Sequence, residues 1–255
     1  MFINNFDPVA FEVLSMEIRW YSLAYIVGIL IGWFLSKKTL IKDTEIREKF
    51  DDYVTYVIFG IIIGGRLGYV LFYDLNYYTS NLTDIFKIWQ GGMSFHGGLI
   101  GVIIASIWFS KKNNHNPFKY LDIIAIVSPI GIFFGRISNF INSELYGIET
   151  DLPWGVKFIQ VDNLYRHPSQ LYEALLEGIL LFLILILIYS KTKYKTGMCS
   201  FIFLILYGAF RIFSEFFREP DLQIGYLFGP ITMGIMLSVV MIVSGFFLII
   251  KKNDR

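Results

Sequence analysis

The sequence predicts an all-α membrane protein with seven transmembrane helices, its N-terminus outside the cell and its C-terminus in the cytoplasm. Of its 255 residues, 55% are hydrophobic and only 17% are charged, a composition typical of integral membrane proteins. Apolar segments recur along the whole chain, and lysine and arginine gather in every second connection between them. These observations favour one integral membrane domain over residues 1–255.

Seven segments approach the roughly 20 mostly apolar residues that a transmembrane helix needs. They lie at 18–36, 53–73, 93–110, 120–141, 170–190, 198–217 and 226–250. Glycines spaced for close helix packing occur at Gly28/Gly32, Gly60/Gly64/Gly68, Gly97/Gly101 and Gly131/Gly135. The connection at 143–168 contains Pro153, Trp154 and Pro168 and is predicted to form a small extracytoplasmic hairpin or lid.

The charge of the connections sets the expected orientation. Five lysines and arginines follow the first span, and three follow each of the third, fifth and seventh spans, Lys193 and Arg255 among them. Because cytoplasmic loops are enriched in these residues, the N-terminus is expected outside. Residues 1–5 contain no lysine or arginine, so no cleavable signal peptide is expected.

Cationic and titratable side chains stand within the apolar segments, at Arg66, His96, Arg136 and Arg211. A charge at the bilayer centre costs about 2.5–3.5 kcal/mol on insertion scales, so such residues face a bundle interior or a wet cavity and mark function. The predicted topology places all four in the outer half of the membrane. A voltage sensor or a through-pore would distribute them across its depth, whereas a reaction site at the outer leaflet would gather them.

Span six carries Tyr207, Arg211, Glu215 and Arg218 at a spacing that puts them on one helix face. Two guanidiniums can grip a phosphate through planar, charge-assisted hydrogen bonds. A glutamate between them would orient them and offset their repulsion. The alternative is an Arg–Glu–Arg ladder that satisfies only itself.

The end of span four adds Arg136 and Asn139, which share a helix face. An arginine inside the helix end, beside an asparagine, fits a cradle for a phosphate or ester, and a snorkelling arginine is the alternative. Span five opens with Glu173 and Glu177. A polar helix start is the alternative there, but the deeper Glu177 needs a partner such as an arginine.

His96 is the candidate base, because an unperturbed histidine pKa of about 6.5 permits proton transfer near neutral pH. A hydrogen-bonded core histidine is the alternative. No clustered ligands accompany His96 or His167, so no metal site is expected. His115 is expected to be a solvated loop residue. Cys199 is the only cysteine, so no internal disulfide can form, and it is expected to be a packing residue.

Four sequence blocks follow one another along the chain: FHGGL at 95–99, GRISNFINSELYG at 135–147, HPSQLYEA at 167–174, and YGAFRIFSEFFREPD at 207–221. Together with the start of the chain, at 7–9 and 18–21, they resemble the bacterial phosphatidylglycerol–prolipoprotein diacylglyceryl transferase family. The resemblance covers about residues 7–245, and the pattern G-R-x-x-N-F-I-N-x-E-x-x-G is highly specific.

The resemblance implies a seven-span enzyme of the bacterial cell membrane. It would move a diacylglyceryl group from phosphatidylglycerol to the lipobox cysteine of a preprolipoprotein, forming a thioether and releasing glycerol phosphate. The implied partners are phosphatidylglycerol, a preprolipoprotein signal peptide and membrane lipid, with no nucleic acid and no metal or organic cofactor. Positions that match the family's essential residues are His96, Arg136, Asn139, Glu144, Gly147, Arg211 and Glu215, with Tyr21, Tyr25, Tyr207 and Arg218. Ile235 departs from the pattern, which has glutamine there.

The resulting hypothesis assigns catalysis to Arg136, Arg211 and His96. The arginines would hold the lipid phosphate and stabilise the charge that grows on the leaving glycerol phosphate. His96 would help to deprotonate the substrate thiol, Asn139 and Glu144 would position the headgroup or the arginines, and the other matched residues would bind substrate. Three alternatives stay open: a transporter of anionic phospholipids, a receptor or structural protein, and another phospholipid-headgroup transferase.

Overall fold

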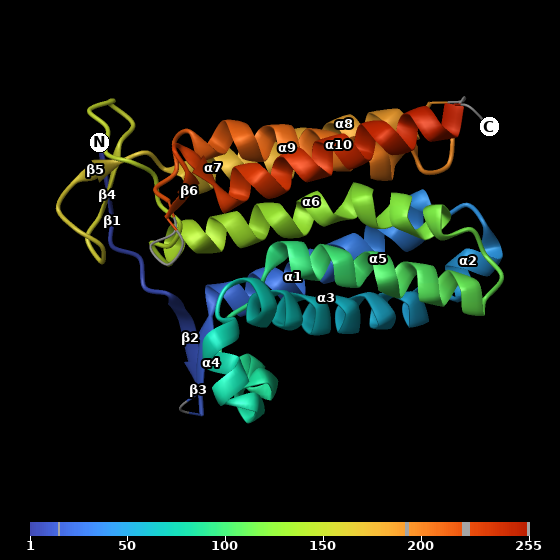
Figure 1. The fold of residues 1–255 in the computed structure, drawn as a ribbon, viewed down its shortest axis with the longest axis horizontal. Helices are drawn as coiled ribbons and strands as arrows, with labels where there is room; N and C mark the ends of the chain where they lie inside the picture. The colour runs from blue at the N-terminus through green and yellow to red at the C-terminus, as the bar shows by residue number, and fades with distance from the viewer. Residues whose placement is uncertain (15, 192–193, 221–224, 254–255) are drawn as a thin grey trace. The chain divides into compact units, whose positions relative to one another are not determined.

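The computed structural model describes residues 1–14, 16–191, 194–220 and 225–253, and it is mostly helical (Figure 1). Lys193, Asp221 and Arg255, which the sequence analysis uses, lie outside the described residues. The chain divides into two compact units. Unit 1 comprises Met1–Ser36 and Ile124–Arg255, and unit 2 comprises Lys37–Ile123.

Unit 1 is built on long apolar helices. They are α1 (Trp20–Leu35), most of α6 (Pro117–Ile141), α9 (Met198–Glu215), α10 (Met233–Asn253) and a continuous helical span made of α7 (Ser169–Glu173), π-helical η4 (Ala174–Leu180) and α8 (Leu181–Tyr189). A second π-helical turn, η1 (Ser36–Leu40), follows α1.

Small residues let these helices approach closely. A Cβ atom added to Gly28 of α1 would lie 2.8 Å from the Cα of Gly131 in α6. A Cβ on Gly208 of α9 would lie 2.8 Å from the carbonyl oxygen of Ser238 in α10. The Gly28–Gly131 contact confirms part of the predicted glycine packing, whereas a Cβ on Gly135 would meet nothing within 4 Å.

Short strands gather at one end of the unit 1 helices (Figure 1). β1 (Phe2–Asn4), β4 (Val156–Phe158) and β5 (Tyr165–Arg166) form a sheet in the order β1-β4-β5, parallel between β1 and β4 and antiparallel between β4 and β5. Two further hairpins are β2 (Val9–Val13) with β3 (Met16–Arg19), and β6 (Tyr226–Phe228) with β7 (Ile231–Thr232). The hairpin predicted within 143–168 is therefore present, but the protein is not purely α-helical.

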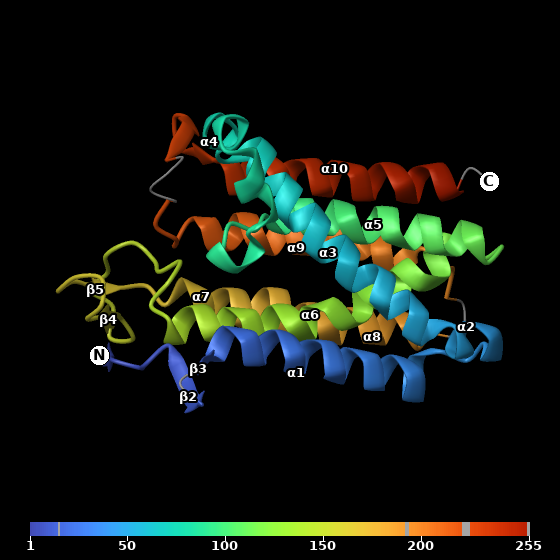
Figure 2. The same ribbon diagram turned by 90° about the horizontal axis from the view of Figure 1, so that it is seen from below.

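Unit 2 is an antiparallel helix pair with short elements at its ends (Figure 2). It contains α2 (Thr44–Glu48), α3 (Phe50–Phe72), α4 (Leu75–Ser80), the 3-10 turns η2 (Leu82–Phe86) and η3 (Ile88–Gln90), and α5 (Phe95–Lys112). Glycines line the contact between α3 and α5: a Cβ on Gly64 would lie 2.9 Å from the Cα of Gly101, and one on Gly68 would lie 2.7 Å from the Cα of Gly97. The helix backbones therefore touch where larger side chains could not fit.

Six helices in the described residues are long and apolar enough to cross a membrane. They are Trp20–Leu40, Phe50–Phe72, Pro117–Ile141, Ser169–Tyr189, Met198–Glu215 and Met233–Lys252. The remaining predicted span, 93–110, forms α5, whose 18 residues include His96 near one end and Lys111 and Lys112 at the other. These polar ends lower its average hydropathy and separate it from the six.

The first and last predicted spans begin later than the sequence suggested. The first starts at Trp20, because Ile18 belongs to β3. The last starts at Met233, because residues 226–232 form the hairpin β6–β7. Gly225 and Gly229 have φ values of 62° and 57°, and Pro230 lacks an amide donor, so a helix cannot run through this segment.

Candidate functional site

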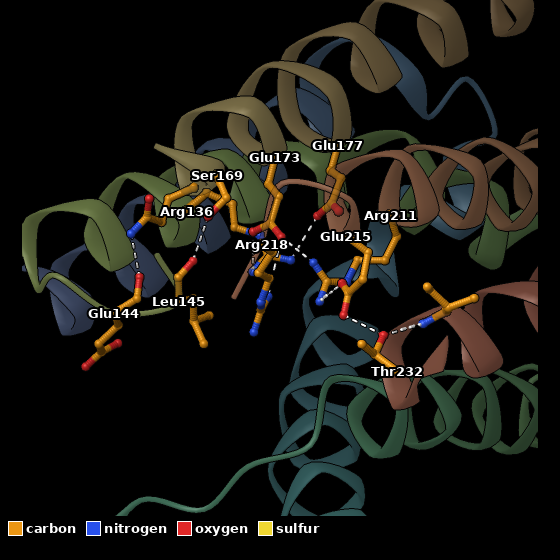
Figure 3. A network of polar contacts seen from close by, with 12 residues as sticks. Arg136, Glu144, Leu145, Ser169, Glu173, Glu177, Arg211, Glu215, Arg218 and Thr232 are labelled. Atoms are coloured by element: carbon orange, nitrogen blue, oxygen red, sulfur yellow. Dashed lines mark hydrogen bonds and ion pairs between the residues drawn. The ribbon is translucent and has the colours of Figure 1, made fainter. Parts of the chain in front are cut away.

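The carboxylate of Glu173 is the point at which arginines from different helices meet. Nη1 of Arg136 lies 3.0 Å from its Oε2, while Nη1 of Arg211 contacts Oε1 and Nη1 of Arg218 lies 3.4 Å from the same oxygen. Figure 3 shows the three guanidinium groups pointing toward this carboxylate. The two arginines proposed from spans four and six are thus close enough to contact one group.

Two further carboxylates complete the network. Glu177 Oε2 lies 2.9 Å from Nη2 of Arg136, and Glu215 Oε2 lies 2.7 Å from Nη2 of Arg211. Together these six residues form the arginine cluster: Arg136, Glu173, Glu177, Arg211, Glu215 and Arg218. Within this set three guanidiniums face three carboxylates, so their formal charges cancel. This balance is what allows so many charges to stay buried together.

Helix geometry brings the cluster together. Arg211 and Glu215 are one turn apart on α9 and pair with each other, while Glu173 and Glu177 are one turn apart on the α7–η4 segment. A Cβ on Gly178 would lie 2.7 Å from the Cβ of Phe133, so η4 approaches α6 closely beside Glu177. Glu177 lies in a π-helical segment, a feature frequent at functional sites.

Glu173 and Glu177 are buried more deeply than the three arginines of the cluster. The side chains of Glu173 and Glu177 are 0% exposed, whereas those of Arg136, Arg211 and Arg218 are 14%, 10% and 6% exposed. These two carboxylates therefore contact the guanidiniums from their buried side. The accessible surface of the cluster belongs to the arginines and to Glu215, whose side chain is 7% exposed.

Thr232 ties α10 to the cluster. Its hydroxyl donates to Glu215 Oε1 at 2.7 Å and accepts from the backbone N–H of Ile235 at 3.3 Å. A Cβ on Gly234 would lie 2.9 Å from Glu215 Oε1, so backbone and carboxylate also meet directly. Ile235, the departure from the family pattern, thus lies beside Glu215, and the polar contact there comes from Thr232.

Asn139 and Glu144 form a second group next to the cluster. Asn139 Nδ2 donates to Glu144 Oε2 at 3.1 Å, and Gln170 Nε2 donates to the Glu144 carbonyl at 2.6 Å. Ser169 Oγ donates to the carbonyl of Leu145 at 2.9 Å, as Figure 3 also shows. The chain after α6 is thereby fastened to the first turn of α7.

Gly147 is required by close backbone packing. Its N–H donates to the carbonyl of His167 at 2.9 Å, and it forms an isolated β-bridge with Arg218. A Cβ at this position would lie 2.6 Å from the Cβ of His167 and would also strike the carbonyl oxygens of His167 and Phe217. The glycine therefore lets three chain segments meet at the backbone of Arg218.

Arg166 fastens the same region from the outside. Its Nε and Nη2 donate to Asp162 Oδ2 at 3.0 and 2.6 Å, and its Nη1 donates to the carbonyl of Gly147 at 3.1 Å and to Glu219 at 3.2 Å. The guanidinium lies over the ring of Tyr146, 4.9 Å from its centroid. Its hydrogen bonds lower the pKa of Asp162 below the ordinary value.

The tyrosines expected to bind substrate have different surroundings. Tyr21 and Tyr25 lie on α1 with ring centroids 5.2 Å apart, and Tyr25 is exposed. Tyr207 is buried on α9 and stacks on Phe203 at 5.6 Å. The spacing predicted Tyr207, Arg211, Glu215 and Arg218 on one helix face. α9 carries the first three, but it ends at Glu215, so Arg218 lies beyond the helix.

His96 and Arg66 both belong to unit 2. His96 is the second residue of α5, whose N-cap Ser94 accepts from the N–H of Gly97 at 3.2 Å. Arg66 donates to backbone carbonyls of the loop before α5, at 2.6 Å to Asp84 and 2.9 Å to Ile85, with further bonds to the carbonyls of Lys87, Gly91 and Gly92. These loop carbonyls satisfy the guanidinium of Arg66. They account for its burial without the functional role that a charge in an apolar segment suggested.

Two other expectations concern His115 and Cys199. The prediction of a solvated His115 is wrong: its side chain is 11% exposed, with Nε2 3.1 Å from Glu45 and Nδ1 2.7 Å from the hydroxyl of Tyr120. Cys199 is buried, as expected of a packing residue. In the described ranges, no group of three His, Cys, Asp or Glu side chains is placed to hold a metal ion.

An apolar cavity of about 690 Å³ lies on the other face of α7. Leu171, Tyr172 and Leu175 line it, together with Phe140, Trp154 and residues of the N-terminal strand. Helical spacing turns Gln170, Glu173 and Glu177 to the opposite face. The segment thus separates an apolar surface from the charged network.

The chain matches, over residues 8–251, the family described as prolipoprotein diacylglyceryl transferase. It belongs to the prolipoprotein diacylglyceryl transferase family. A Rickettsia bellii protein named phosphatidylglycerol–prolipoprotein diacylglyceryl transferase is 51% identical over 259 residues, which is 100% of this chain and 98% of the relative. Proteins with the same name from Rickettsia felis (49% identical, 100% of both chains) and Nitratidesulfovibrio vulgaris (49% identical, 98% of this chain and 95% of the relative) agree.

Membership of this transferase family confirms the resemblance and the expectation of an enzyme. The contribution of Glu173 was missed, because the run that opens span five was also compatible with a polar helix start. A signal was present: Gln170, Glu173 and Glu177 are spaced three and four residues apart on a helix that is otherwise apolar. Thr232 gave no comparable signal, since a single threonine before a helix is ordinary.

Proposed function

We propose that this chain transfers a diacylglyceryl group from phosphatidylglycerol to the lipobox cysteine of a preprolipoprotein, forming a thioether and releasing glycerol phosphate. The arginine cluster carries the proposal, because Arg136 and Arg211 contact the two oxygens of one carboxylate. A phosphate presents oxygens with similar spacing and charge, so the same two guanidiniums suit it. The family and the names of its members supply the acceptor.

The proposed chemistry is a displacement at carbon. The substrate thiolate attacks the glycerol carbon that bears the phosphate, a C–S bond forms, and the C–O bond breaks with its electron pair passing to the phosphate oxygen. The leaving group thereby gains a negative charge. Guanidiniums of Arg136 and Arg211 fixed at that oxygen would stabilise the transition state more than the bound lipid, which is what lowers the barrier.

His96 is proposed as the group that takes the thiol proton, since the thiolate is the nucleophile. Its place in the first turn of α5 would put the thiolate near a helix N-terminus, which favours nearby negative charge. Asn139, Glu144, Gly147, Glu215 and Arg218 are proposed to shape the headgroup site. Tyr21, Tyr25 and Tyr207 are proposed to contact substrate.

The membrane arrangement is proposed as one integral domain with seven spans in the bacterial cytoplasmic membrane. α5 would be the seventh span, since it lies along α3 through a row of glycine contacts and has 18 residues. The distribution of lysine and arginine supports an external N-terminus and a cytoplasmic C-terminus. The strands of unit 1 and the cluster would then belong to the outer leaflet side.

The test is direct. Purified protein is incubated with phosphatidylglycerol and a lipobox peptide, and mass spectrometry is used to look for the diacylglyceryl adduct on the peptide cysteine. Arg136→Ala and Arg211→Ala should abolish the adduct while the protein still inserts and purifies folded, and His96→Asn should reduce it strongly. Wild-type rates in both arginine variants would end the phosphate-clamp hypothesis, and near-normal turnover of His96→Asn would remove His96 as the base.

A further inference from the structure

We propose that Glu173 is a positioning residue of the transferase, whose carboxylate sets the distance and orientation between the guanidiniums of Arg136 and Arg211. The inference rests on the proposed phosphate clamp and adds a residue to it. It concerns a side chain that does not touch the substrate itself. Its effect on the reaction would pass entirely through the arginines.

Glu173 has no substitute in the network. Among the six residues of the cluster, only Glu173 pairs with arginines from both α6 and α9. Glu177 pairs with Arg136 on α6, and Glu215 pairs with Arg211 on its own helix. The relative position of the two proposed clamp arginines therefore depends on one carboxylate.

Glu173 contacts the guanidiniums from their buried side. Its side chain is completely buried, whereas Arg136 and Arg211 retain 14% and 10% exposure. A carboxylate behind the guanidiniums can hold them in place without occupying the surface that a phosphate would approach. Donors held in this way need little rearrangement when charge develops, which is the source of their catalytic value.

Glu173 also balances the charge of the arginines. With three guanidiniums matched by three carboxylates, the cluster can remain ordered before substrate arrives. Without Glu173, Arg136 and Arg211 would repel each other in a poorly screened environment. A shift of about 1 Å in catalytic groups can cost a factor of about 100 in rate. Glu173 is thus expected to matter more for turnover than for binding of the lipid.

The experiment uses Glu173→Asp, which keeps the charge but withdraws the carboxylate by about 1.5 Å, the length of one C–C bond. The matched variant is Glu177→Asp, which loosens one arginine only, and Glu48→Gln on α2, an exposed position, is the neutral control. Turnover, KM for phosphatidylglycerol, and the inhibition constant of glycerol phosphate are measured on purified full-length protein.

For Glu173→Asp we expect kcat to fall about 10- to 100-fold, KM to stay within about threefold, and inhibition by glycerol phosphate to weaken about tenfold. Glu177→Asp should lose less. A loss of folded enzyme would lower kcat without changing the inhibition constant, so that result overturns the proposal. Turnover near the wild-type value, or an equal or greater loss in Glu177→Asp, overturns it too.

A second variant covers failure of the first to fold. Glu173→Gln keeps the side-chain length but replaces one acceptor oxygen with an amide donor, which releases one guanidinium. It should also lose kcat, and wild-type kcat would overturn the proposal. If Arg211→Ala is inactive while the Glu173 variants turn over normally, only the role of Glu173 is refuted. If Arg136→Ala and Arg211→Ala are both active, the clamp itself is refuted.

Discussion

At the scale of single residues, burial sets the behaviour of His167. Its side chain is mostly buried just before α7, Nδ1 lies 3.0 Å from the hydroxyl of Tyr172, and desolvation lowers its pKa below the ordinary value of 6.5. The unfolded chain therefore binds a proton at a higher pH than the folded chain. As pH falls below about 6.5 the unfolded state gains this proton first, so the stabilising contribution of neutral His167 declines.

The prediction is that the free energy of unfolding in detergent decreases between pH 7.5 and pH 5, and that His167→Gln makes this decrease smaller. His115→Gln is the control: it removes a histidine of unit 2 instead, and shows whether the change in pH dependence is specific to His167. Denaturant titrations at a series of pH values give the comparison. Identical pH dependence in wild type and His167→Gln would contradict this account of His167.

Residue-scale inference from the sequence succeeded where a charge had to find a counter-charge. Glu177 was expected to need an arginine inside the membrane, and Arg136 lies 2.9 Å away. The convergence on Glu173 could not be predicted, because it depends on how α7 is rotated against α6 and α9. The structural role of Arg66 could not be predicted for a related reason. The sequence shows a charge in an apolar segment, but not the loop carbonyls that accept its hydrogen bonds.

At the scale of elements, the glycine contacts between α3 and α5 are a decisive feature of unit 2. Gly64→Ala should destabilise the protein by about 1–3 kcal/mol, since its Cβ would lie 2.9 Å from the Cα of Gly101, and backbone cannot move aside as a side chain can. Gly98→Ala is the control, because its Cβ would have no neighbour closer than 3.8 Å. The measurement is the thermal unfolding midpoint of both variants in detergent. Equal midpoints for Gly64→Ala and Gly98→Ala would refute the packing argument.

The hydrogen bonds from Arg66 to the loop before α5 lead to a second prediction for unit 2. Arg66→Lys should free the loop around η2 and η3, because a lysine cannot reach the carbonyls of Asp84, Ile85 and Gly92 together. Hydrogen exchange at residues 84–94 should become faster while exchange within α3 stays slow. Arg19→Lys, at an exposed position, is the matched control. Unchanged protection of the loop would show that Arg66 does not hold it.

Element types were predictable from hydropathy, and element ends were not. Each apolar segment of the prediction contains a helix, because its composition leaves no other way to satisfy the backbone. The last span was predicted to begin seven residues too early, because Tyr226–Phe228 and Ile231 are mostly apolar, yet the two segments pair as strands around Gly229 and Pro230. The β1 strand was not predicted for another reason, since its partner lies far along the chain: Ile3 of β1 lies opposite Lys157 of β4.

At the scale of the whole molecule, the distribution of lysine and arginine predicts an external N-terminus and a cytoplasmic C-terminus. A fluorescent protein that matures only in the cytoplasm should fluoresce when fused after α10, whereas alkaline phosphatase fused there should be inactive. Alkaline phosphatase inserted between β4 and β5 should be active. The reverse pattern would place the arginine cluster on the cytoplasmic side and contradict a reaction at the outer leaflet.

The central claim is that guanidiniums from α6 and α9 share one lipid phosphate. An experimental structure of the full-length protein with bound phosphatidylglycerol tests it most directly. We predict that the phosphate accepts hydrogen bonds from both Arg136 and Arg211, with Glu173 still bridging them from the buried side. A phosphate seated away from these two arginines would contradict the account.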